Sequence, residues 1–343
     1  MKEDFIKTII EQVANNAALS KDESYKAFNM ILNGEFTNAQ MASFLTSLKI
    51  KGENIEEIAG AALAMRENAL SMPLENSIQL ELIDTCGTGG DRKNTFNIST
   101  CAALIAAGAG VKIAKHGNYG VSSKSGSADV LKELGVNIFM EPQRVLKSIE
   151  YANIGFLFAP SFHMAMKFAA PVRKELGFKT IFNILGPLTN PFGAKKQIIG
   201  AYSKDLAAKI AEVLKSLNTE RAFVVHGRDG IDEVSLSSVT DIYELDSGNV
   251  RHFEFNPKEY GFDLSGEAMF QSFSVAESAK IIYDIISGKL GPRTDIALLN
   301  AGFAILVSGK VNSFEDSFDA ARDSIVSGRA IKSLQNLIEV SNK

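Results

Sequence analysis

The chain has 343 residues, of which 45% are hydrophobic and 22% are charged. This composition is typical of a folded globular protein, and the length suits one large domain with a smaller one beside it. Because the formal net charge is -4, no overall positive field would draw the chain to a nucleic acid or an anionic membrane.

The N-terminal residues predict a helix and not a signal peptide, because acids stand beside the lysines and no apolar core ends in small residues. No run approaches the ~18 uninterrupted apolar residues of a membrane span. Two cysteines, Cys86 and Cys101, lack the spacing and the neighbouring ligands of a zinc site. We therefore expect a cytoplasmic protein with two reduced thiols and no membrane partner.

The first 72 residues carry helix-start signals in series. Each signal pairs an N-cap residue with Glu or Gln three positions later, and the pairs are Ser20 with Glu23, Thr37 with Gln40, and Asn54 with Glu57. Gly52 is placed to end the second of these helices. The sequence predicts a helical domain over residues 1–72, for packing or dimerisation, to which amphipathic helices at about 161–185 return.

Beyond residue 73 short apolar runs alternate with helical stretches. The first run alternates as a strand does, at Ile78, Leu80 and Leu82. The predicted strands are residues 80–83, 111–113, 136–139, 155–158, 198–202 and 222–225. Strands separated by helices indicate βαβ units and a mostly parallel sheet. The predicted fold class is α/β: a small N-terminal all-helical domain and a larger α/β domain over residues 73–343.

A glycine-rich loop, Gly87-Thr88-Gly89-Gly90-Asp91, follows the first predicted strand. Ligands of α/β folds bind outside the carboxyl ends of strands. Glycines let the backbone approach a ligand, and successive N–H groups can form an anion-binding nest. The loop differs from the dinucleotide pattern, since Arg92 stands at the third glycine's place. A plain tight turn is the alternative interpretation of the glycines.

Two more strand-to-helix junctions carry groups suited to phosphate. Thr95, Asn97, Ser99 and Thr100 precede a helix-forming run at 101–107, which is more than an ordinary cap requires. Lys115-His116-Gly117-Asn118 ends the next strand, and a loop rich in serine and glycine at 122–127 leads into a helix at 129–134. Capping and a solvated loop are the alternatives. Three such junctions together predict a ligand with phosphate at more than one place.

Adjacent carboxylates, Asp232 and Glu233, follow the strand at 222–225 on a loop that contains glycine. Magnesium takes one or two carboxylates and completes its shell with water and phosphate oxygens. A solvated surface pair is the alternative interpretation of this dipeptide.

These strings, in this order and spacing, resemble the anthranilate phosphoribosyltransferase family across essentially the whole chain. The matching segments are residues 87–91, 97–100, 115–118, 124–129, 159–163, 172–177, 183–191 and 232–233. The resemblance implies transfer of the 5-phosphoribosyl group from phosphoribosyl pyrophosphate to the amine of anthranilate, in tryptophan biosynthesis. It also implies a homodimer, Mg²⁺ as cofactor, and the fold shared with pyrimidine nucleoside phosphorylases.

The resemblance further implies roles for matched positions. Those expected around phosphoribosyl pyrophosphate are Gly87, Gly90, Asp91, Thr95, Asn97, Ile98, Ser99, Thr100, Lys115, His116, Gly117, Asn118, Tyr119, Gly120, Val121, Ser122, Ser123 and Ser127. Those expected at anthranilate are Gly87, Asn118, His163 and Arg173, and those expected at magnesium, directly or through water, are Ser99, Asp232 and Glu233.

The chemistry of Arg173 also supports its expected contact with anthranilate, because a guanidinium offers a planar two-donor fork to an aromatic carboxylate. A salt bridge with a neighbour such as Glu175 or an exposed helix position is the alternative for Arg173, and a structural role is the alternative for His163. No general base is assigned, since the aniline-like amine is neutral at pH 7. His116 is a candidate for that role, but its place suits loop structure equally well.

Two rival functions remain open at this point. A pyrimidine nucleoside phosphorylase would share the fold, but that family's Lys-His-Ser-x-Gly-Gly loop is absent. A non-catalytic nucleic-acid-binding relative should have a basic surface and should lack the metal and anthranilate positions. The chain is acidic overall and retains Asp232, Glu233 and Arg173.

Overall fold

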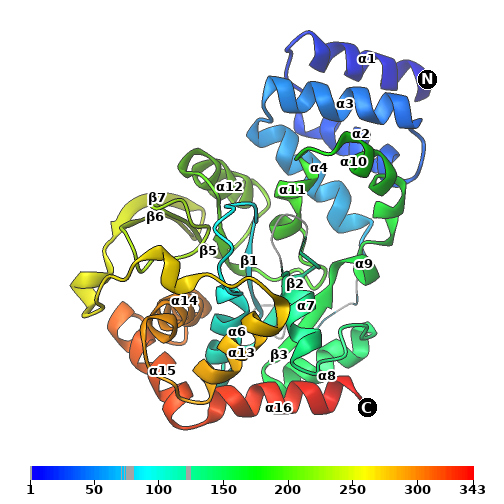
Figure 1. The fold of residues 1–343 in the computed structure, drawn as a ribbon. Coiled ribbons are helices and arrows are strands. Elements are labelled where there is room, and N and C mark those ends of the chain that lie inside the picture. The colour runs from blue at the N-terminus through cyan, green and yellow to red at the C-terminus, as the bar shows by residue number, and fades with distance from the viewer. Residues whose placement is uncertain (1, 71, 73, 75–80, 121–124) are drawn as a thin grey trace.

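The computed structural model describes residues 2–70, 72, 74, 81–120 and 125–343 of the chain. A helical part lies at one end of the molecule, and a larger part built around a sheet lies at the other, as Figure 1 shows. The helical part begins with α1 (Lys2–Ala14), α2 (Lys21–Leu32), α3 (Asn38–Lys51) and α4 (Ile55–Glu67). No helix in the described ranges is long and apolar enough to cross a membrane.

The predicted helix starts are confirmed. Ser20, Thr37 and Asn54 each accept a hydrogen bond from the backbone three residues on, and the side chains of Glu23, Gln40 and Glu57 each accept one from the N-cap N–H. Gly52 ends α3, as predicted, with a φ of 82°. These caps fix where each helix begins, and so which apolar face turns inward.

The segment at 161–185 is helical but broken into short pieces. It contains α9 (Ala159–Phe162), the 3-10 turn η1 (Met164–Phe168), α10 (Ala170–Leu176) and α11 (Phe182–Leu185). Proline occupies the first turn of α9 and of α10, and Gly177 ends α10 in the left-handed conformation. Helices α10 and α11 pack on α3 and α4 (Figure 1).

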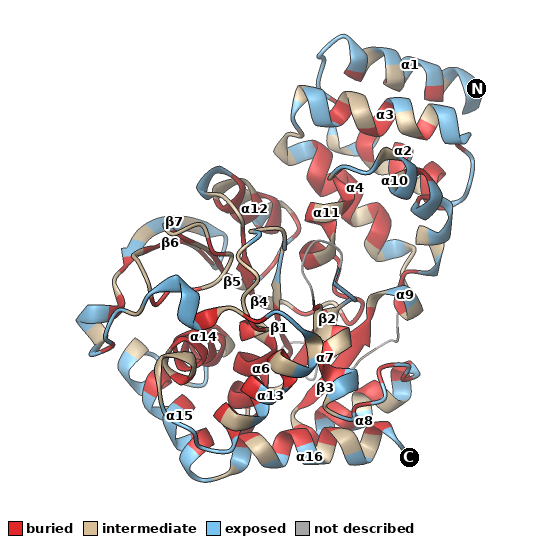
Figure 2. Cartoon of the chain, in the orientation of Figure 1, coloured by how far each residue is buried: buried red, intermediate tan, exposed pale blue. Residues whose placement is uncertain are grey.

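The sheet has seven strands in the described part of the chain, in the order β3-β2-β1-β4-β5-β6-β7. Its parallel strands are β1 (Ile83–Gly87), β2 (Ile113–Gly117), β3 (Ile154–Phe158), β4 (Lys196–Gly200) and β5 (Arg221–Gly227). The predicted α/β fold class with a mostly parallel sheet is confirmed. The central strands are buried (Figure 2), as expected when helices cover both faces.

Two groups of helices enclose the sheet. One side is covered by α6 (Ile98–Gly108), α8 (Pro142–Ala152), α13 (Val275–Ile286), α14 (Pro292–Ser308), α15 (Phe314–Val326) and α16 (Arg329–Ser341). The other side carries α12 (Lys204–Ser216), whose core is continuous with that of α1–α4. The short α7 (Ser127–Glu133) follows the loop after β2. This arrangement leaves the carboxyl ends of the parallel strands facing the helical part.

Four of the predicted strands need correction. The strand predicted at 80–83 begins only at Ile83 and runs to Gly87, while residues 75–80 lie outside the described part. The strands predicted at 111–113 and 198–202 are likewise displaced, to Ile113–Gly117 and Lys196–Gly200.

No strand forms at 136–139. The Asn137 N–H donates to the Ser341 hydroxyl, and the Asn137 side chain accepts from the Phe139 N–H. One long-range and one local side-chain bond therefore take the place of a ladder. The strands β6 (Thr240–Asp246) and β7 (Asn249–Phe255) form an antiparallel pair that was not predicted from the sequence. Ser247 and Gly248 join them, both at positive φ.

Candidate active site

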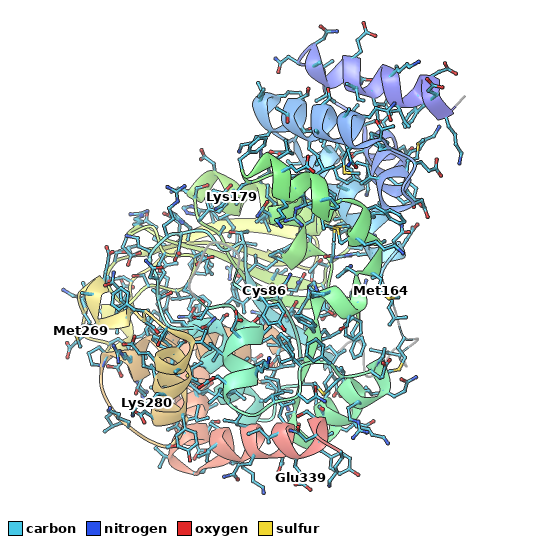
Figure 3. The ribbon with its side chains drawn as sticks, turned by 45° about the vertical axis from the view of Figure 1, so that its right-hand side comes forward. Cys86, Met164, Lys179, Met269, Lys280 and Glu339 are labelled. Carbon is cyan, nitrogen blue, oxygen red and sulfur yellow. The ribbon has the colours of Figure 1, made fainter. Side chains whose placement is uncertain are left out.

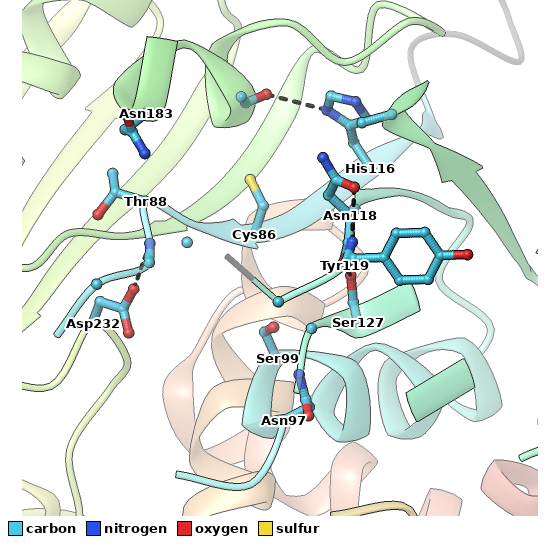
Figure 4. A pocket seen from close by; sticks show the side chains of 18 of the residues that line it. Cys86, Thr88, Asn97, Ser99, His116, Asn118, Tyr119, Ser127, Asn183 and Asp232 are labelled. Carbon is cyan, nitrogen blue, oxygen red and sulfur yellow. Dashed lines mark hydrogen bonds between the residues drawn. The ribbon is translucent and has the colours of Figure 1, made fainter. Parts of the chain in front are cut away.

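A cavity of about 670 Å³ lies where the carboxyl ends of the strands face the helical part. Its walls come from the loops after β1, β2 and β5, from the start of α6 and from the segment α9–α11 (Figure 4). Most of the predicted site residues line it, and they are Gly87, Gly90, Asp91, Thr95, Asn97, Ile98, Ser99, Lys115, His116, Gly117, Asn118, Tyr119, Gly120, Ser127, His163, Arg173, Asp232 and Glu233.

One predicted position among the described residues does not line this cavity. Thr100 is fully buried in the first turn of α6 and does not line the cavity. Val121, Ser122 and Ser123 lie outside the described residues. Helix geometry explains the burial of Thr100. The residues before it, Ile98 and Ser99, line the cavity, and the turn of α6 directs Thr100 into the core.

The glycine loop is held to neighbouring strands by backbone and carboxylate contacts. The Thr88 N–H donates to the Gly200 carbonyl at 2.8 Å, and the Gly89 N–H donates to Asp232 Oδ2 at 2.9 Å. Gly89 and Gly90 have φ values of 63° and 82°, which side chains rarely tolerate. At Gly87 a Cβ would lie 2.9 Å from Asp232 Oδ2. A plain turn would account for the positive φ of Gly89 and Gly90, whereas the absence of a side chain at Gly87 also serves the close approach of Asp232.

Three carboxylates gather beside this loop: Asp91, Asp232 and Glu233. Desolvation and the nearby charge of Asp91 raise the pKa of Asp232 to about 7. Burial, followed by the charge of Asp232, raises the pKa of Glu233 well above its usual value, although Lys115 opposes this shift. Asp91 Oδ2 is buried without a partner among the described residues. The raised pKa values indicate that nearby positive charge does not fully compensate this cluster.

The cluster suits a cation that also binds substrate oxygens. Within the described ranges no group of three or more His, Cys, Asp or Glu side chains forms a preformed metal centre. Magnesium needs only one or two carboxylates when water and phosphate complete its shell. The orphaned oxygen of Asp91 and the raised pKa of Asp232 and of Glu233 fit such an ion.

The start of α6 connects the cluster to the phosphate-suited residues. The Ser99 N–H donates to Glu233 Oε1 at 3.1 Å. Asn97, at the N-cap, makes no side-chain cap, and its Oδ1 accepts from the hydroxyls of Ser125 and Ser278. Its side chain thus ties α6 to the loop before α7 and to α13.

Lys115 is almost completely buried, with 1% exposure, and reaches the cavity floor. Its ammonium donates to the Thr85 carbonyl at 2.5 Å and to the Ser99 hydroxyl at 3.4 Å. Burial lowers its pKa, which the nearby carboxylates Asp84 and Glu233 oppose. The Lys115 amine therefore stands in the cavity lining and is shared with protein oxygens.

Two histidines pack together at the side of the cavity, with ring centroids 5.1 Å apart. His116 Nδ1 lies 3.1 Å from the Gly186 carbonyl oxygen, and His163 Nε2 lies 3.1 Å from that of Thr189. A carbonyl only accepts, so these nitrogens are assigned the protons. Burial lowers the pKa of His116 to about 3 and that of His163 to about 4. Both rings are neutral at pH 7.

Arg173 projects from α10 into the cavity wall and lies over the Phe182 ring, 5.3 Å from its centroid. In the described part of the chain no carboxylate pairs with it, Glu175 included, so the alternative of a salt bridge is not supported. Burial lowers its pKa, yet a guanidinium stays charged at neutral pH. A partly buried, unpaired guanidinium in a cavity wall favours an anionic ligand.

Several wall residues had no ligand contact assigned from the sequence. They include Cys86, Thr88, Met166, Lys179, Asn183 and Gly186. Asn183 and Gly186 fall within a segment that carried the family resemblance, whereas Lys179 stands in no recognised pattern. Only the fold shows that Lys179 reaches the glycine loop, where it donates to the Gly90 carbonyl at 3.2 Å.

Comparison with known proteins places this geometry in a family. The helical bundle domain of the glycosyl transferase family matches residues 7–69, and its α/β domain matches residues 79–331. The anthranilate phosphoribosyltransferase of Petrotoga mobilis is 46% identical over 333 residues, which cover 97% of this chain and 96% of that protein.

Solved structures agree with this assignment. The anthranilate phosphoribosyltransferase of Thermus thermophilus is 36% identical, with a TM-score of 0.90 over 98% of this chain and 99% of that one. The yeast (Saccharomyces cerevisiae) enzyme, solved with phosphoribosyl pyrophosphate and magnesium, is 31% identical, with a TM-score of 0.90 over 99% of this chain and 98% of that one. It has also been solved with 4-fluoroanthranilate, with 30% identity and a TM-score of 0.88 over 100% and 98% of the two chains.

The fold and the site therefore define a glycosyl transferase with a helical bundle and an α/β domain. Within that class, the chain belongs to the anthranilate phosphoribosyltransferase family. The family resemblance inferred from the sequence is confirmed, and neither rival function is supported by these relatives.

Proposed function

We propose that this chain transfers the 5-phosphoribosyl group from phosphoribosyl pyrophosphate to the amine of anthranilate, in tryptophan biosynthesis. The products are N-(5-phosphoribosyl)anthranilate and pyrophosphate. One observation carries the proposal: a single cavity brings the glycine loop and the carboxylates Asp91, Asp232 and Glu233 together with the unpaired guanidinium of Arg173. A phosphorylated donor substrate suits the glycine loop and the carboxylates, and an aromatic carboxylate suits Arg173.

The donor would lie against the loops after β1 and β2 and the start of α6. N–H groups of the glycine loop and the helix N-terminus favour phosphate oxygens. The described cavity residues that we assign to the donor substrate are Gly87, Gly90, Asp91, Thr95, Asn97, Ile98, Ser99, Lys115, His116, Gly117, Asn118, Tyr119, Gly120 and Ser127. The proposal also includes Val121, Ser122 and Ser123, which lie outside the described residues, and the buried Thr100, which would act only by supporting α6.

Magnesium would be held by Asp232 and Glu233, with Ser99 contributing directly or through water. When bound, the ion supplies Lewis-acid stabilisation of the charge that develops on the departing pyrophosphate. The side chains do complementary work, because Lys115 places its amine in the cavity lining and Ser99 links α6 to Glu233.

The acceptor would lie beside Arg173, with Gly87, Asn118 and His163 around it. The guanidinium can hold the carboxylate of anthranilate through two parallel hydrogen bonds. That contact would place the neutral amine towards C1 of the ribose, on the face opposite the leaving group. Positioning of this kind supplies much of the reduction in the activation barrier of the transfer. The amine is already neutral, so it needs no deprotonation before it attacks.

No side chain is assigned as a general base. Each neutral ring, His116 and His163, has one nitrogen that could accept a proton, but the other nitrogen of each ring is held by a backbone carbonyl of the protein. The proton that the amine loses after attack can pass to water or to pyrophosphate.

The test is the decrease of anthranilate fluorescence when phosphoribosyl pyrophosphate and magnesium are added to the purified protein. We expect the decrease to require all three components. A nucleoside with inorganic phosphate serves as the control substrate pair, and turnover of that pair without use of anthranilate would overturn the proposal.

We further propose a cytoplasmic homodimer that associates through a helical domain of residues 1–72 and the helices at about 161–185, beside a catalytic domain of residues 73–343. The burial of α10 and α11 against α3 and α4 supports this grouping. Sedimentation at micromolar concentration should give twice the mass of one chain, and a monomer at that concentration would overturn the assembly proposal.

A further inference from the structure

Lys179 makes a contact across the cavity that the function proposed above does not use. Its ammonium donates to the carbonyl oxygen of Gly90 at 3.2 Å and lies 4.3 Å from the centroid of the Tyr202 ring. Figure 3 shows Lys179 at the junction between the helical part and the sheet. The residue thus connects the segment between α10 and α11 to the loop after β1.

The contact fixes the direction of a particular backbone donor. The Gly90 carbonyl and the Asp91 N–H belong to one peptide unit, which is planar and trans. An ammonium that holds the carbonyl on one side therefore directs the N–H to the opposite side. Among the described residues none accepts a hydrogen bond from this N–H, which leaves it available to an anion in the cavity.

The other end of the connection leads to Arg173. Gly177 ends α10 and donates its N–H to the Arg173 carbonyl at 3.3 Å. Three residues further on, the Thr180 N–H donates to Asn183 Oδ1 at 3.0 Å, at the start of α11. Lys179 therefore lies on a short connector whose two ends are both held. A displacement of Lys179 is transmitted to the helix that carries Arg173.

The charges around Lys179 leave its ammonium balanced between two groups. Asp91 on the glycine loop and Asp232 on the loop after β5 attract it, while Arg92 and Lys49 repel it. An anion bound to the Asp91 N–H would polarise the shared peptide unit and make the Gly90 carbonyl a stronger acceptor. The hydrogen bond to Lys179 would then strengthen when the donor substrate binds.

We propose that Lys179 is a positioning residue that couples the two substrate sites, because it joins the glycine loop to the segment that carries Arg173. This inference rests on the proposed function. Occupation of the glycine loop by pyrophosphate oxygens tightens the Lys179–Gly90 contact and holds Arg173 in place for the acceptor carboxylate. By thermodynamic reciprocity, the acceptor tightens pyrophosphate binding by the same factor.

The experiment measures the affinity of anthranilate by its fluorescence, with and without magnesium pyrophosphate, a pair that cannot turn over. In the unmodified protein we expect magnesium pyrophosphate to tighten anthranilate binding by about fivefold or more. In Lys179→Met the tightening should fall below about twofold, while binding of anthranilate alone changes by less than about twofold. Lys179→Arg should restore most of the tightening.

Lys174→Met is the matched control, since Lys174 is an exposed lysine on the same segment, one turn of helix before the connector. It should behave as the unmodified protein. Tyr202→Leu removes the ring beneath the ammonium and should reduce the tightening partly, so it replaces Lys179→Met if that variant fails to fold by circular dichroism.

Two results would overturn the coupling. One is an unmodified protein that binds anthranilate equally with and without magnesium pyrophosphate, and the other is a Lys179→Met variant with undiminished tightening. An unmodified protein that does not bind anthranilate at all would instead contradict the proposed function, so the two failures are distinguishable.

Discussion

Asp232 Oδ2 accepts a hydrogen bond from the Gly89 N–H at 2.9 Å, although 143 positions separate the two residues in the chain. The loop after β5 is thereby held against the loop after β1, across the intervening strand β4. One carboxylate therefore shapes the glycine loop and also contributes charge to the cluster with Asp91 and Glu233. Substitutions that keep the shape and remove the charge can separate these two roles.

The double variant Asp232→Asn with Glu233→Gln should lose activity while keeping the fold. An amide oxygen still accepts from the Gly89 and Ser99 N–H groups, but it binds magnesium far more weakly than a carboxylate does. We expect kcat/KM to fall by about 100-fold or more, as for loss of a major electrostatic contribution. Circular dichroism should be unchanged. Near-normal turnover of the double variant at limiting magnesium would remove the metal assignment.

Without magnesium, thermal stability should fall as the pH rises from about 6.5 to 8. The folded-state pKa of Asp232 is raised to about 7, and that of Glu233 is raised well above its usual value. The folded protein therefore holds protons that the unfolded chain has released, and folding stability decreases with increasing pH. The histidines oppose this trend only below about pH 6.5, where the unfolded chain protonates them.

The measurement is the melting temperature as a function of pH in a chelator, and again in excess magnesium. Magnesium should abolish the decline, because the bound ion compensates both carboxylates. Asp232→Asn with Glu233→Gln should abolish it even in the chelator. A decline that persists in the double variant would mean that other groups cause it.

The sequence predicted the helix starts and the strand-to-helix junctions because both depend on local chemistry. Ser20, Thr37 and Asn54 cap their own helices, and Gly89 and Gly90 adopt positive φ within one loop. The predicted ends of the strands were less accurate, because a strand ends where the hydrogen bonds from its neighbouring strand end. β1 ends at Gly87 because β4 runs in register beside it as far as Gly200, a relation that no local pattern contains.

Contacts between distant segments explain what the sequence did not predict about the site. Thr100 stands among cavity residues in the sequence, but the helical turn carries it into the core. Lys179 carries no motif, and its contact with Gly90 depends on how α10 and α11 lie above the sheet. The carboxylate pair Asp232–Glu233 was singled out, but its closeness to Asp91 follows only from the folded chain.

Arg173→Ala should impair the use of anthranilate far more than the use of phosphoribosyl pyrophosphate. Among the described residues no carboxylate pairs with the guanidinium, which lies over the Phe182 ring. Its removal therefore leaves no buried partner unsatisfied. Loss of a charged hydrogen bond worth about 1.5–3 kcal/mol corresponds to an increase of about 10- to 100-fold in the KM for anthranilate. Steady-state kinetics with each substrate varied in turn provide the measurement.

The control for Arg173→Ala is Lys174→Ala, on the exposed side of the same helix. It removes a neighbouring positive charge and should change neither KM by more than about twofold. Arg173→Lys should recover only part of the loss, because an ammonium lacks the two-donor fork. Equal effects of Arg173→Ala on both substrates would contradict its assignment to anthranilate.

At saturating magnesium, turnover should show no histidine ionisation between pH 6.5 and 8.5. Burial holds the pKa of His116 at about 3 and that of His163 at about 4, so neither changes charge in this range. His116→Asn keeps a donor for the Gly186 carbonyl and deletes Nε2, which has no partner among the described residues. Because a general base contributes about 100- to 10,000-fold, retention of activity within about tenfold would support its absence from that role. A loss in that larger range, accompanied by rescue with free imidazole, would instead identify His116 as the base and would require a proton transfer from the amine during attack.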